Sequence, residues 1–362
     1  FLSAPPLEDG QEERYLHSIA KGHSGSVYEH CIAALEKGCN LTDRGLPRLG
    51  GGDWNDGLNK LGAAGRGESV WLAMFIAQVM QKFSVVCDQL GDTGRAEDYR
   101  VKAEELKRAV DEYCYDGEWY LRAFGDDGQP FGSKQNDEAR IDLLPQSFAV
   151  FCGMPDQSRV QSGLDAAYRY LVDEEHQLIR LFTPPLTART NKAGYIAAYP
   201  KGVRENGGQY THAGIWFALA LLYWGDADRG YHLLQMLNPA HRTQDSAIAE
   251  QYRLEPHYMA ADIYSDGKTA GRGGWSLYTG AAAWYYRAVI EGLLGLSFEG
   301  DRLYITPRIP THWPGFSVDI EEGGAAIRLR VKRGEQKGLY VNGEPAEAVP
   351  LDGKNVEATL VI

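Results

Sequence analysis

The stretch ESVWLAMFIAQVMQKFSVVCDQL, residues 68–90, decides the fold class. Its apolar residues recur every three or four positions, which is the spacing of one face of an α-helix. These residues are Val70, Trp71, Met74, Phe75, Val79, Phe83, Val86 and Leu90. Gly91 follows directly and ends the pattern, since glycine commonly terminates helices. The sequence therefore predicts a long helix from Glu68 to Leu90 with one buried side.

Helical periodicity continues on both sides of this stretch. It predicts helices over residues 26–37, 96–113, 142–152, 157–172, 211–223, 227–237, 247–252 and 276–293. A short hairpin interrupts them, with a strand at 119–124 and a turn at 126–128, and residues 1–22 are expected to form an extended lead-in. Helix pairs in series, joined by loops rich in Gly, Asp and Trp, indicate an α/α toroid whose active site lies where the loops converge.

The pattern changes from helix to strand at Leu296. Ala326 to Val331 alternates between apolar and charged residues, as a half-buried strand does, and Asn342-Gly343 is a typical hairpin turn. We therefore expect a mainly α protein with two domains, a catalytic toroid over residues 1–295 and a small antiparallel β-sandwich over residues 296–362.

Composition limits the function classes that remain open. The chain of 362 residues has 44% hydrophobic residues and a formal net charge of -12. Such an acidic balance argues against a nucleic-acid or anionic-membrane partner. The five cysteines lack any metal-binding spacing and fit a reducing, cytoplasmic location. No apolar run of membrane-spanning length and no signal peptide are visible, so we expect no membrane contact from this segment. No motif predicts a metal or an organic cofactor.

The most polar loop precedes the long helix and reads GGGDWNDGLN, residues 50–59. Three glycines leave the approach to it free of side chains, and Asp53 and Asp56 lie on either side of Trp54 and Asn55. One interpretation is a tight turn in which the Asp and Asn side chains bond their own backbone. Trp54 favours another, because a large aromatic ring among glycines is costly to expose unless it lines a binding site.

Two later loops have a similar composition. Residues 199–212, YPKGVRENGGQYTH, precede an apolar helix, and His212 falls in its first turn, where free N–H groups favour an anion. A capped helix start with a solvated run of charges explains this loop equally well. Residues 271–280, GRGGWSLYTG, again set a Trp among glycines, and Thr279-Gly280 offers a hydroxyl and an unshielded N–H to a phosphate oxygen. Neither a Walker nor a Rossmann phosphate-binding pattern occurs.

Together these loops resemble the signature blocks of glycoside hydrolase family 94, the inverting phosphorylases that include cellobiose and chitobiose phosphorylase. The blocks are GDWNDG at 52–57, GVRENGGQ at 202–209 and GRGGWSLYTG at 271–280. The glycine-rich first block, with Tyr28-Glu29-His30-Cys31 before it, is most similar to the β-1,2-glucan branch. That branch includes 1,2-β-oligoglucan phosphorylases and the C-terminal module of cyclic β-1,2-glucan synthases.

The resemblance implies an (α/α)6 barrel followed by a C-terminal β-sandwich. It also implies an N-terminal β-sandwich, a linker and the first barrel helices, yet only 55 residues precede Asp56. We therefore expect an incomplete barrel. The remainder of a longer polypeptide, or a second chain as in a homodimer, would complete it.

The same resemblance assigns roles to individual residues. Asp56, the second Asp of the Asp-Trp-Asn-Asp motif, matches the family's general acid. Trp54 and Glu205 match positions that line the family's donor sugar site. Further residues expected at the substrate are Asp53, Arg204, Gln209 and Trp275, and of these we expect Asp53 rather to orient the loop. The residues that match the family's phosphate-binding positions are His212, Thr279 and Gly280.

These roles predict phosphorolysis of a β-linked gluco-oligosaccharide. A phosphorylase needs only the acid of the two carboxylates that an inverting glycosidase uses, because phosphate attacks as an anion. Asp56 would protonate the glycosidic oxygen while the co-substrate phosphate attacks the anomeric carbon from the opposite face, which gives α-glucose 1-phosphate. Enclosure by Trp54 would help Asp56 to keep its proton, and a protonated His212 would pair with phosphate. Two alternatives stay open, an inverting hydrolase with Glu205 as base and an inactive carbohydrate-binding module of a larger synthase.

Overall fold

The computed structural model describes residues 24–187, 193–277 and 279–362, with residues 2, 3, 5, 8, 11, 14–16, 19 and 20 near the start of the chain. Its α-helices are α1 (Val27–Gly38), α2 (Val70–Gln89), α3 (Thr93–Tyr113), α4 (Leu143–Phe151), α5 (Gln157–Leu171), α6 (Thr211–Trp224), α7 (Ala227–Leu237), α8 (Pro239–Arg242), α9 (Ser246–Tyr252) and α10 (Thr279–Arg287). Single turns of other helix types are η1 (Asp56–Leu58), η3 (Tyr195–Ala198), η4 (Gly267–Thr269) and the π-helical η5 (Ala288–Leu293).

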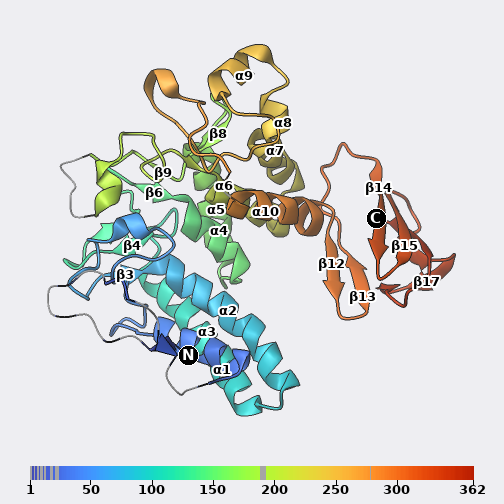
Figure 1. Ribbon diagram of the computed structural model, residues 1–362, viewed down its shortest axis with the longest axis horizontal. Coiled ribbons are helices and arrows are strands. Elements are labelled where there is room, and N and C mark those ends of the chain that lie inside the picture. Colours follow the sequence, from blue (N-terminus) through green and yellow to red (C-terminus); the bar gives the residue numbers. More distant parts are fainter. Residues whose placement is uncertain are drawn as a thin grey trace.

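The long helices pack as consecutive pairs. Helix α2 packs on α3, α4 on α5 and α6 on α7, while α2, α4, α6 and α10 contact one another in that order. Figure 1 shows the series from α1–α3 at the bottom, through α4–α6, to α7–α9 at the top. Ser69 and Asp142 cap the starts of α2 and α4, where they accept hydrogen bonds from free backbone N–H groups. These caps fix where each helix begins.

One hydrophobic core runs through these helices, and α6 lies at its centre. Residues 213–222 of α6 are all buried, which explains why its sequence is apolar on every side. Gly225, with φ of 99°, ends α6 in the left-handed conformation that glycine adopts without strain.

The helices predicted from periodicity are observed, with ends shifted by a few residues. The predicted helix at 276–293 divides into α10 and the π-helical η5, and the four-residue α8 was not predicted. The predicted strand at 119–124 is shorter, because only its last two residues pair with the strand after the turn. Most of the predicted lead-in, residues 1–22, lies outside the described residues.

Helix α2 bears on one expectation. The sequence suggested no apolar run long enough to span a membrane, yet α2 has 20 residues and contains an 18-residue window with a mean hydropathy of 1.6, which is long and apolar enough by length and composition. Half of this stretch is buried inside the protein, where α2 packs on α3 and α4. The core helix of a globular domain has the same properties, so the test does not distinguish the two.

Short antiparallel strand pairs connect the helices. They are β1 (Leu2–Ser3) with β2 (Ile19–Ala20), β3 (Glu68–Ser69) with β4 (Ala123–Phe124) and β5 (Pro130–Phe131), β6 (Ile141–Asp142) with β9 (Phe182–Thr183), β7 (Val172–Asp173) with β8 (Leu178–Ile179), and β10 (Gln209–Tyr210) with β11 (Asp262–Ile263). Strands β3, β6 and β10 lead directly into α2, α4 and α6. The helix starts are therefore held by backbone pairing.

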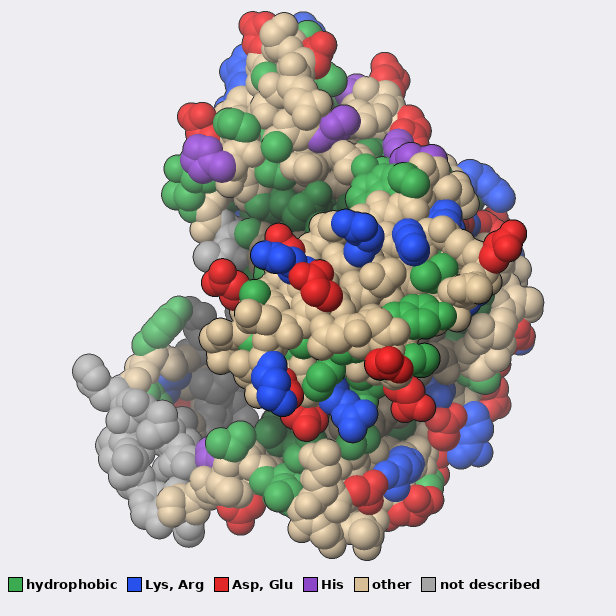
Figure 2. All heavy atoms as spheres, turned by 90° about the vertical axis from the view of Figure 1, so that its right-hand side faces the viewer, with side chains coloured by type: hydrophobic (Ala, Val, Ile, Leu, Met, Phe, Trp, Pro, Cys, Tyr) green, Lys and Arg blue, Asp and Glu red, His purple; other side chains and the backbone are tan. Residues whose placement is uncertain are grey.

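From Leu296 onwards the regular structure consists of strands. A three-stranded sheet has the order β12 (Leu296–Glu299), β13 (Arg302–Ile305), β18 (Val349–Pro350), and a five-stranded sheet has the order β14 (Gly315–Glu322), β15 (Ala325–Lys332), β19 (Val356–Val361), β16 (Gly338–Val341), β17 (Glu344–Ala346). These strands bury a second, smaller core. Figure 2 views the molecule from this side, and its surface mixes Lys and Arg with Asp and Glu.

The prediction of a purely antiparallel C-terminal module is wrong for one strand pair. Strands β15 and β19 run parallel, with Ile327 opposite Val356. Parallel neighbours need a long connection, and here the chain passes through β16, β17 and β18 before β19 returns beside β15.

Candidate functional site

The loop of residues 50–59 contacts the starts of three helices. Asp53 accepts a hydrogen bond from the hydroxyl of Ser69, the residue before α2, at 2.5 Å. Trp54 donates one to His212 in the first turn of α6, from Nε1 to Nδ1 at 3.0 Å. The contact with the start of α4 runs through a buried arginine. The loop thus lies at the end of the helical array where the N-termini of α2, α4 and α6 gather.

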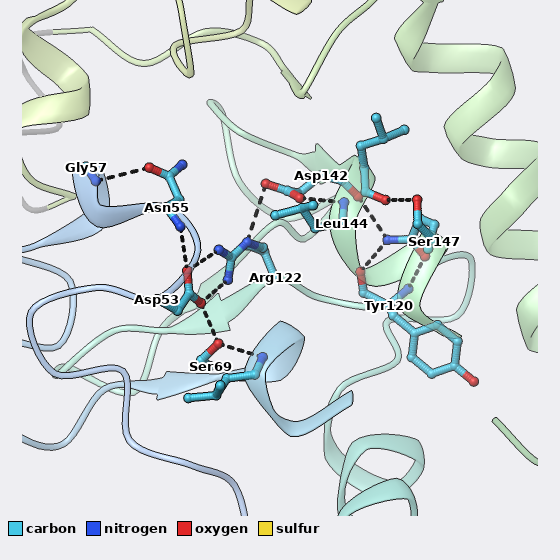
Figure 3. A network of polar contacts seen from close by, with 12 residues as sticks. Asp53, Asn55, Gly57, Ser69, Tyr120, Arg122, Asp142, Leu144 and Ser147 are labelled. Carbon is cyan, nitrogen blue, oxygen red and sulfur yellow. Dashed lines mark hydrogen bonds and ion pairs between the residues drawn. The ribbon is translucent and has the colours of Figure 1, made fainter. Parts of the chain in front are cut away.

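That arginine is Arg122, at the centre of the network in Figure 3. Its guanidinium donates two hydrogen bonds to Asp53, from Nη2 to Oδ1 at 2.6 Å and from Nη1 to Oδ2 at 2.7 Å. Its Nε lies 3.6 Å from Oδ2 of Asp142, the residue before α4. The three side chains are at most 2% exposed. A buried ionic network therefore joins the loop to the helical core.

The two carboxylates of this network respond differently to burial. Burial works to raise the pKa of Asp53, but the charge and hydrogen bonds of Arg122 outweigh it and hold that pKa below its ordinary value. Burial raises the pKa of Asp142 to about 6, because Arg122 is farther away and compensates less. Asp53 is buried and bonded at both oxygens, so its side chain positions the loop, the role that the sequence favoured, and the sugar contact also considered for it is corrected.

Asp56 lies three residues farther along, and it is exposed. The phenol of Tyr195 donates a 2.6 Å hydrogen bond to Asp56 Oδ1. Tyr195 begins η3, which packs on η1, the turn that Asp56 begins. The expected enclosure of Asp56 by Trp54 is not observed, because the Trp54 ring packs edge-on against Tyr210, with 5.0 Å between centroids.

His212 is a neutral side chain in this setting. Burial lowers its pKa to about 4, so the protonated form that would pair with phosphate is disfavoured near neutral pH. The indole N–H of Trp54 can only donate, so Nδ1 of His212 accepts and Nε2 carries the hydrogen. The ring also packs against Trp216, with 4.0 Å between centroids. His212 thus offers one N–H donor of fixed orientation, which suits a phosphate oxygen without a positive charge.

Asp262 holds the two later loops together. Its buried carboxylate accepts hydrogen bonds from the backbone N–H groups of Arg204, at 3.2 Å, and Trp275, at 3.0 Å. Burial raises the pKa of Asp262. The Arg204 guanidinium lies 4.7 Å from the ring centroid of Trp275 and forms an ion pair with Glu205 at 3.3 Å. The structure therefore brings Arg204, Glu205 and Trp275 into one cluster, as expected for residues of one site.

The remaining predicted residues have different outcomes. Gln209 is buried, accepts a hydrogen bond from the Ile179 amide at 2.9 Å and donates to the Thr211 hydroxyl at 3.1 Å. Its predicted substrate contact is corrected, because the side chain supports the backbone around β10. Gly280 lies in the first turn of α10 and faces open space. The side chain of Thr279 lies outside the described residues, so its phosphate contact stays a prediction.

Sequence reasoning missed the roles of Arg122, Asp142, Asp262 and Tyr195. The role of Arg122 could have been inferred, since it is the only charge in the apolar run at 119–124, and a charge in a buried strand needs a buried partner. The capping role of Asp142 could also have been inferred, because an Asp just before an apolar helix is a common cap. No sequence feature pointed to Tyr195, because its partner Asp56 lies 139 residues away. Among the described side chains, no group of three or more His, Cys, Asp or Glu could hold a metal ion.

Comparison with known proteins identifies the family to which the chain belongs. The catalytic-domain model of the glycosyl hydrolase 94 superfamily matches residues 2–295. The chain is 43% identical to the cyclic beta-(1,2)-glucan synthase NdvB of Rhizobium meliloti, over 96% of this chain and 12% of the synthase. It is 32% identical to the cellobionic acid phosphorylase of Neurospora crassa, over 91% of this chain and 42% of that protein. The N,N'-diacetylchitobiose phosphorylase of Vibrio furnissii is 28% identical, with 91% and 41% covered. The chain thus spans less than half the length of each of these relatives.

One solved structure is similar at the level of the fold. A sialidase superposes with a TM-score of 0.54 and 15% identity, over 81% of this chain and 26% of that chain. At this identity the likeness shows the fold alone and carries nothing about activity.

Proposed function

Because the chain belongs to the glycosyl hydrolase 94 family, we propose that it cleaves a β-linked gluco-oligosaccharide by inverting phosphorolysis. The products are α-glucose 1-phosphate and a glucan shortened by one unit. Two relatives with phosphorylase names, the cellobionic acid and diacetylchitobiose enzymes, support this reaction class. The protein's own residues supply the arguments that follow.

The observation that carries the proposal is the contrast between Asp56 and the other carboxylates of the site. Asp56 is exposed, whereas Asp53 is buried against Arg122, Asp262 is buried on two backbone amides, and Glu205 is 6% exposed. A carboxyl group held in a buried ion pair is a poor proton donor or base. One accessible carboxyl group is what phosphorolysis requires, while inverting hydrolysis requires two with room for water between them.

The second reactant is inorganic phosphate, and we propose that His212, Thr279 and Gly280 bind it. The neutral His212 ring donates from Nε2, which is fixed by the bond from Trp54 to Nδ1. Helix α6 has no side-chain cap. The Thr211 N–H donates to the Ala261 carbonyl at 2.9 Å, so the donors we propose for the anion are the next N–H groups of the first turn. Backbone donors of this kind favour an anion even on a protein with a net charge of -12.

The substrate we propose is a β-1,2-glucan, with Trp54, Arg204, Glu205 and Trp275 at its binding site. Support comes from the 43% identity with a cyclic beta-(1,2)-glucan synthase. We place the reaction in the cytoplasm, because all five cysteines are free thiols, as in proteins of reducing compartments.

For the architecture, we propose an (α/α)6 barrel over residues 1–295 and a β-sandwich over residues 296–362. The family model ends at residue 295, next to the first residue of β12. Helices α2, α4, α6 and α10 each contribute an aromatic ring to one apolar groove. These rings are Phe75, Phe148, Trp216 and Trp284. Further helices, from the rest of a longer polypeptide or from a second copy, would cover this groove and close the barrel.

A phosphate-dependence assay tests the reaction. The protein is incubated with a panel of β-linked glucans, with and without phosphate, and glucose 1-phosphate and free glucose are measured. We expect sugar phosphate from β-1,2-glucan only when phosphate is present. Free glucose in the absence of phosphate would indicate the hydrolase instead, and calorimetric glucan binding without turnover would indicate a binding module.

Asp56→Asn tests the assignment of the acid. The amide keeps the size of the side chain but has no acidic proton, so we expect turnover to fall by a factor of about 100 or more. Glucan binding, measured by calorimetry, should stay within about twofold, since the substitution leaves the buried contacts of the loop intact. Normal turnover in this variant would refute the assignment.

A further inference from the structure

We propose that Tyr195 is a positioning residue for the general acid, a role that rests on the proposed function. Its phenol selects which oxygen of Asp56 delivers the proton. The hydrogen bond from Tyr195 to Oδ1 is 2.6 Å long, the short distance typical of a hydroxyl bonded to a carboxylate. Oδ1 is thereby occupied, and Oδ2 is the oxygen left to carry the proton.

The phenol acts as a permanent donor. Burial and, after it, the hydrogen bond and charge of Asp56 raise the pKa of Tyr195 far above the working pH. A carboxylate can only accept, so the direction of the bond is fixed when Asp56 is ionised. Tyr195 is 43% exposed, so its contact with Asp56 lies at the accessible surface of the site.

The backbone holds Tyr195 in place against the loop that carries the acid. Its amide donates to the side chain of Asn59 at 3.1 Å. Gly194, at φ of 124°, approaches so closely that a Cβ there would lie 2.3 Å from Asn59 Oδ1 and 2.5 Å from the Gly57 carbonyl. A Cβ on Gly57 would in turn lie 2.9 Å from the side chain of Ile196. Segment 193–198 and the acid loop are thus packed as one unit.

This contact contributes when charge develops on Asp56. In the reaction a proton passes from Oδ2 to the glycosidic oxygen, and the bond between that oxygen and the anomeric carbon breaks with its electron pair staying on oxygen. A phosphate oxygen bonds the anomeric carbon from the opposite face. Asp56 is left as a carboxylate, and a hydrogen bond to an ionised group is about twice as strong as one to a neutral group. The Tyr195 hydroxyl therefore stabilises the transition state more than the ground state.

Tyr195→Phe tests this role, because it removes the hydroxyl and keeps the ring. We expect kcat for glucan phosphorolysis to fall about tenfold, because about half the strength of a hydrogen bond to a charged group is gained only when Asp56 ionises, with KM for glucan within about twofold. With dinitrophenyl β-glucoside, whose leaving group needs no proton, the loss should shrink to about twofold or less. Tyr170→Phe is the matched control, since Tyr170 is also 43% exposed and belongs to a different element, α5; its kcat should equal that of the wild type.

The possible outcomes each bear on the positioning role of Tyr195. An unchanged kcat in Tyr195→Phe would overturn the positioning role while leaving phosphorolysis in place. An equal loss with both substrates would also overturn it, because the effect would then not pass through the acid's proton. Absence of phosphorolysis by the wild-type protein would overturn the proposed function, and the role of Tyr195 with it.

Discussion

Replacing Arg122 by methionine should destabilise the protein severely, because it leaves two buried carboxylates without their shared cation. Methionine has a similar length and no charge. The wild-type guanidinium makes two hydrogen bonds to Asp53, at 2.6 and 2.7 Å, and is fully buried. A hydrogen bond to a charged group contributes about 1.5 to 3 kcal/mol, so two are worth about 3 to 6 kcal/mol. Breaking one partner of a buried ion pair costs about 3 to 5 kcal/mol, which agrees.

The size of this effect should depend on pH in a defined direction. In the wild type the folded pKa of Asp53 lies below its unfolded value, so its stabilising contribution is complete above that unfolded value and is lost as pH falls through the folded pKa. Without Arg122, burial acts alone and raises the pKa of Asp53, so the penalty is largest near neutral pH and is relieved by protonation. The difference in unfolding free energy between wild type and Arg122→Met should therefore shrink from pH 7.5 to pH ~4.5.

Equilibrium urea unfolding, followed by tryptophan fluorescence, measures this difference. Arg328→Met is the matched control, since Arg328 pairs with Glu357 at 3.3 Å but both side chains are 69% exposed. Exposed ion pairs contribute little, so this variant should unfold at nearly the wild-type midpoint. A loss below about 1 kcal/mol in Arg122→Met, or one that is equal at both pH values, would refute the view that this network anchors the loop.

Two further predictions follow from the pKa shifts. Burial places the folded pKa of Asp142 at about 6, above its ordinary 3.8, so ionising this group costs stability as pH rises through that interval. Asp142→Asn keeps a cap for α4. In urea unfolding, its free energy of unfolding relative to that of the wild type should rise by up to roughly 3 kcal/mol between pH 4 and 7, and a difference that stays constant over this range would contradict the argument. His212 should stay neutral, with its hydrogen on Nε2, down to about pH 4, and imidazole nitrogen NMR that showed a midpoint near 6.5 would contradict the burial argument.

The helices could be predicted from sequence because burial of a helix produces the repeating pattern of apolar residues by which it is recognised. The apolar period of α2 identified the helix, but its packing face only in part. Val70, Trp71 and Met74 are buried as expected, whereas Phe75, Val86 and Leu90 are exposed, and the buried side continues through Met80, Ser84 and Cys87. The parallel pairing of β15 with β19 could not be predicted in this way. Each strand shows the same alternation whichever neighbour it has, and the choice of partner depends on contacts between segments about 30 residues apart.

Two of the loops singled out in the sequence meet in space. The loop at residues 50–59 contacts the end of the loop at residues 199–212, as the hydrogen bond between Trp54 and His212 shows. The charge state of His212 could not be predicted, because burial beside Trp216 determines it and burial is a tertiary property. The partner of Asp53 could not be predicted for a similar reason, since Arg122 lies 69 residues away and no local pattern connects them.

The two carboxylates of the GDWNDG motif illustrate why one loop needs opposite environments. If Asp56 anchored the loop through a buried ion pair, its oxygens would be occupied and it could neither reach a sugar nor exchange a proton. If Asp53 were exposed, the loop would lose its connection to the start of α2 and to Arg122. Separating the tasks by three residues lets burial hold the loop in place while Asp56, the proposed acid, stays accessible. Tyr195 then adds the single directional contact that an exposed carboxylate lacks.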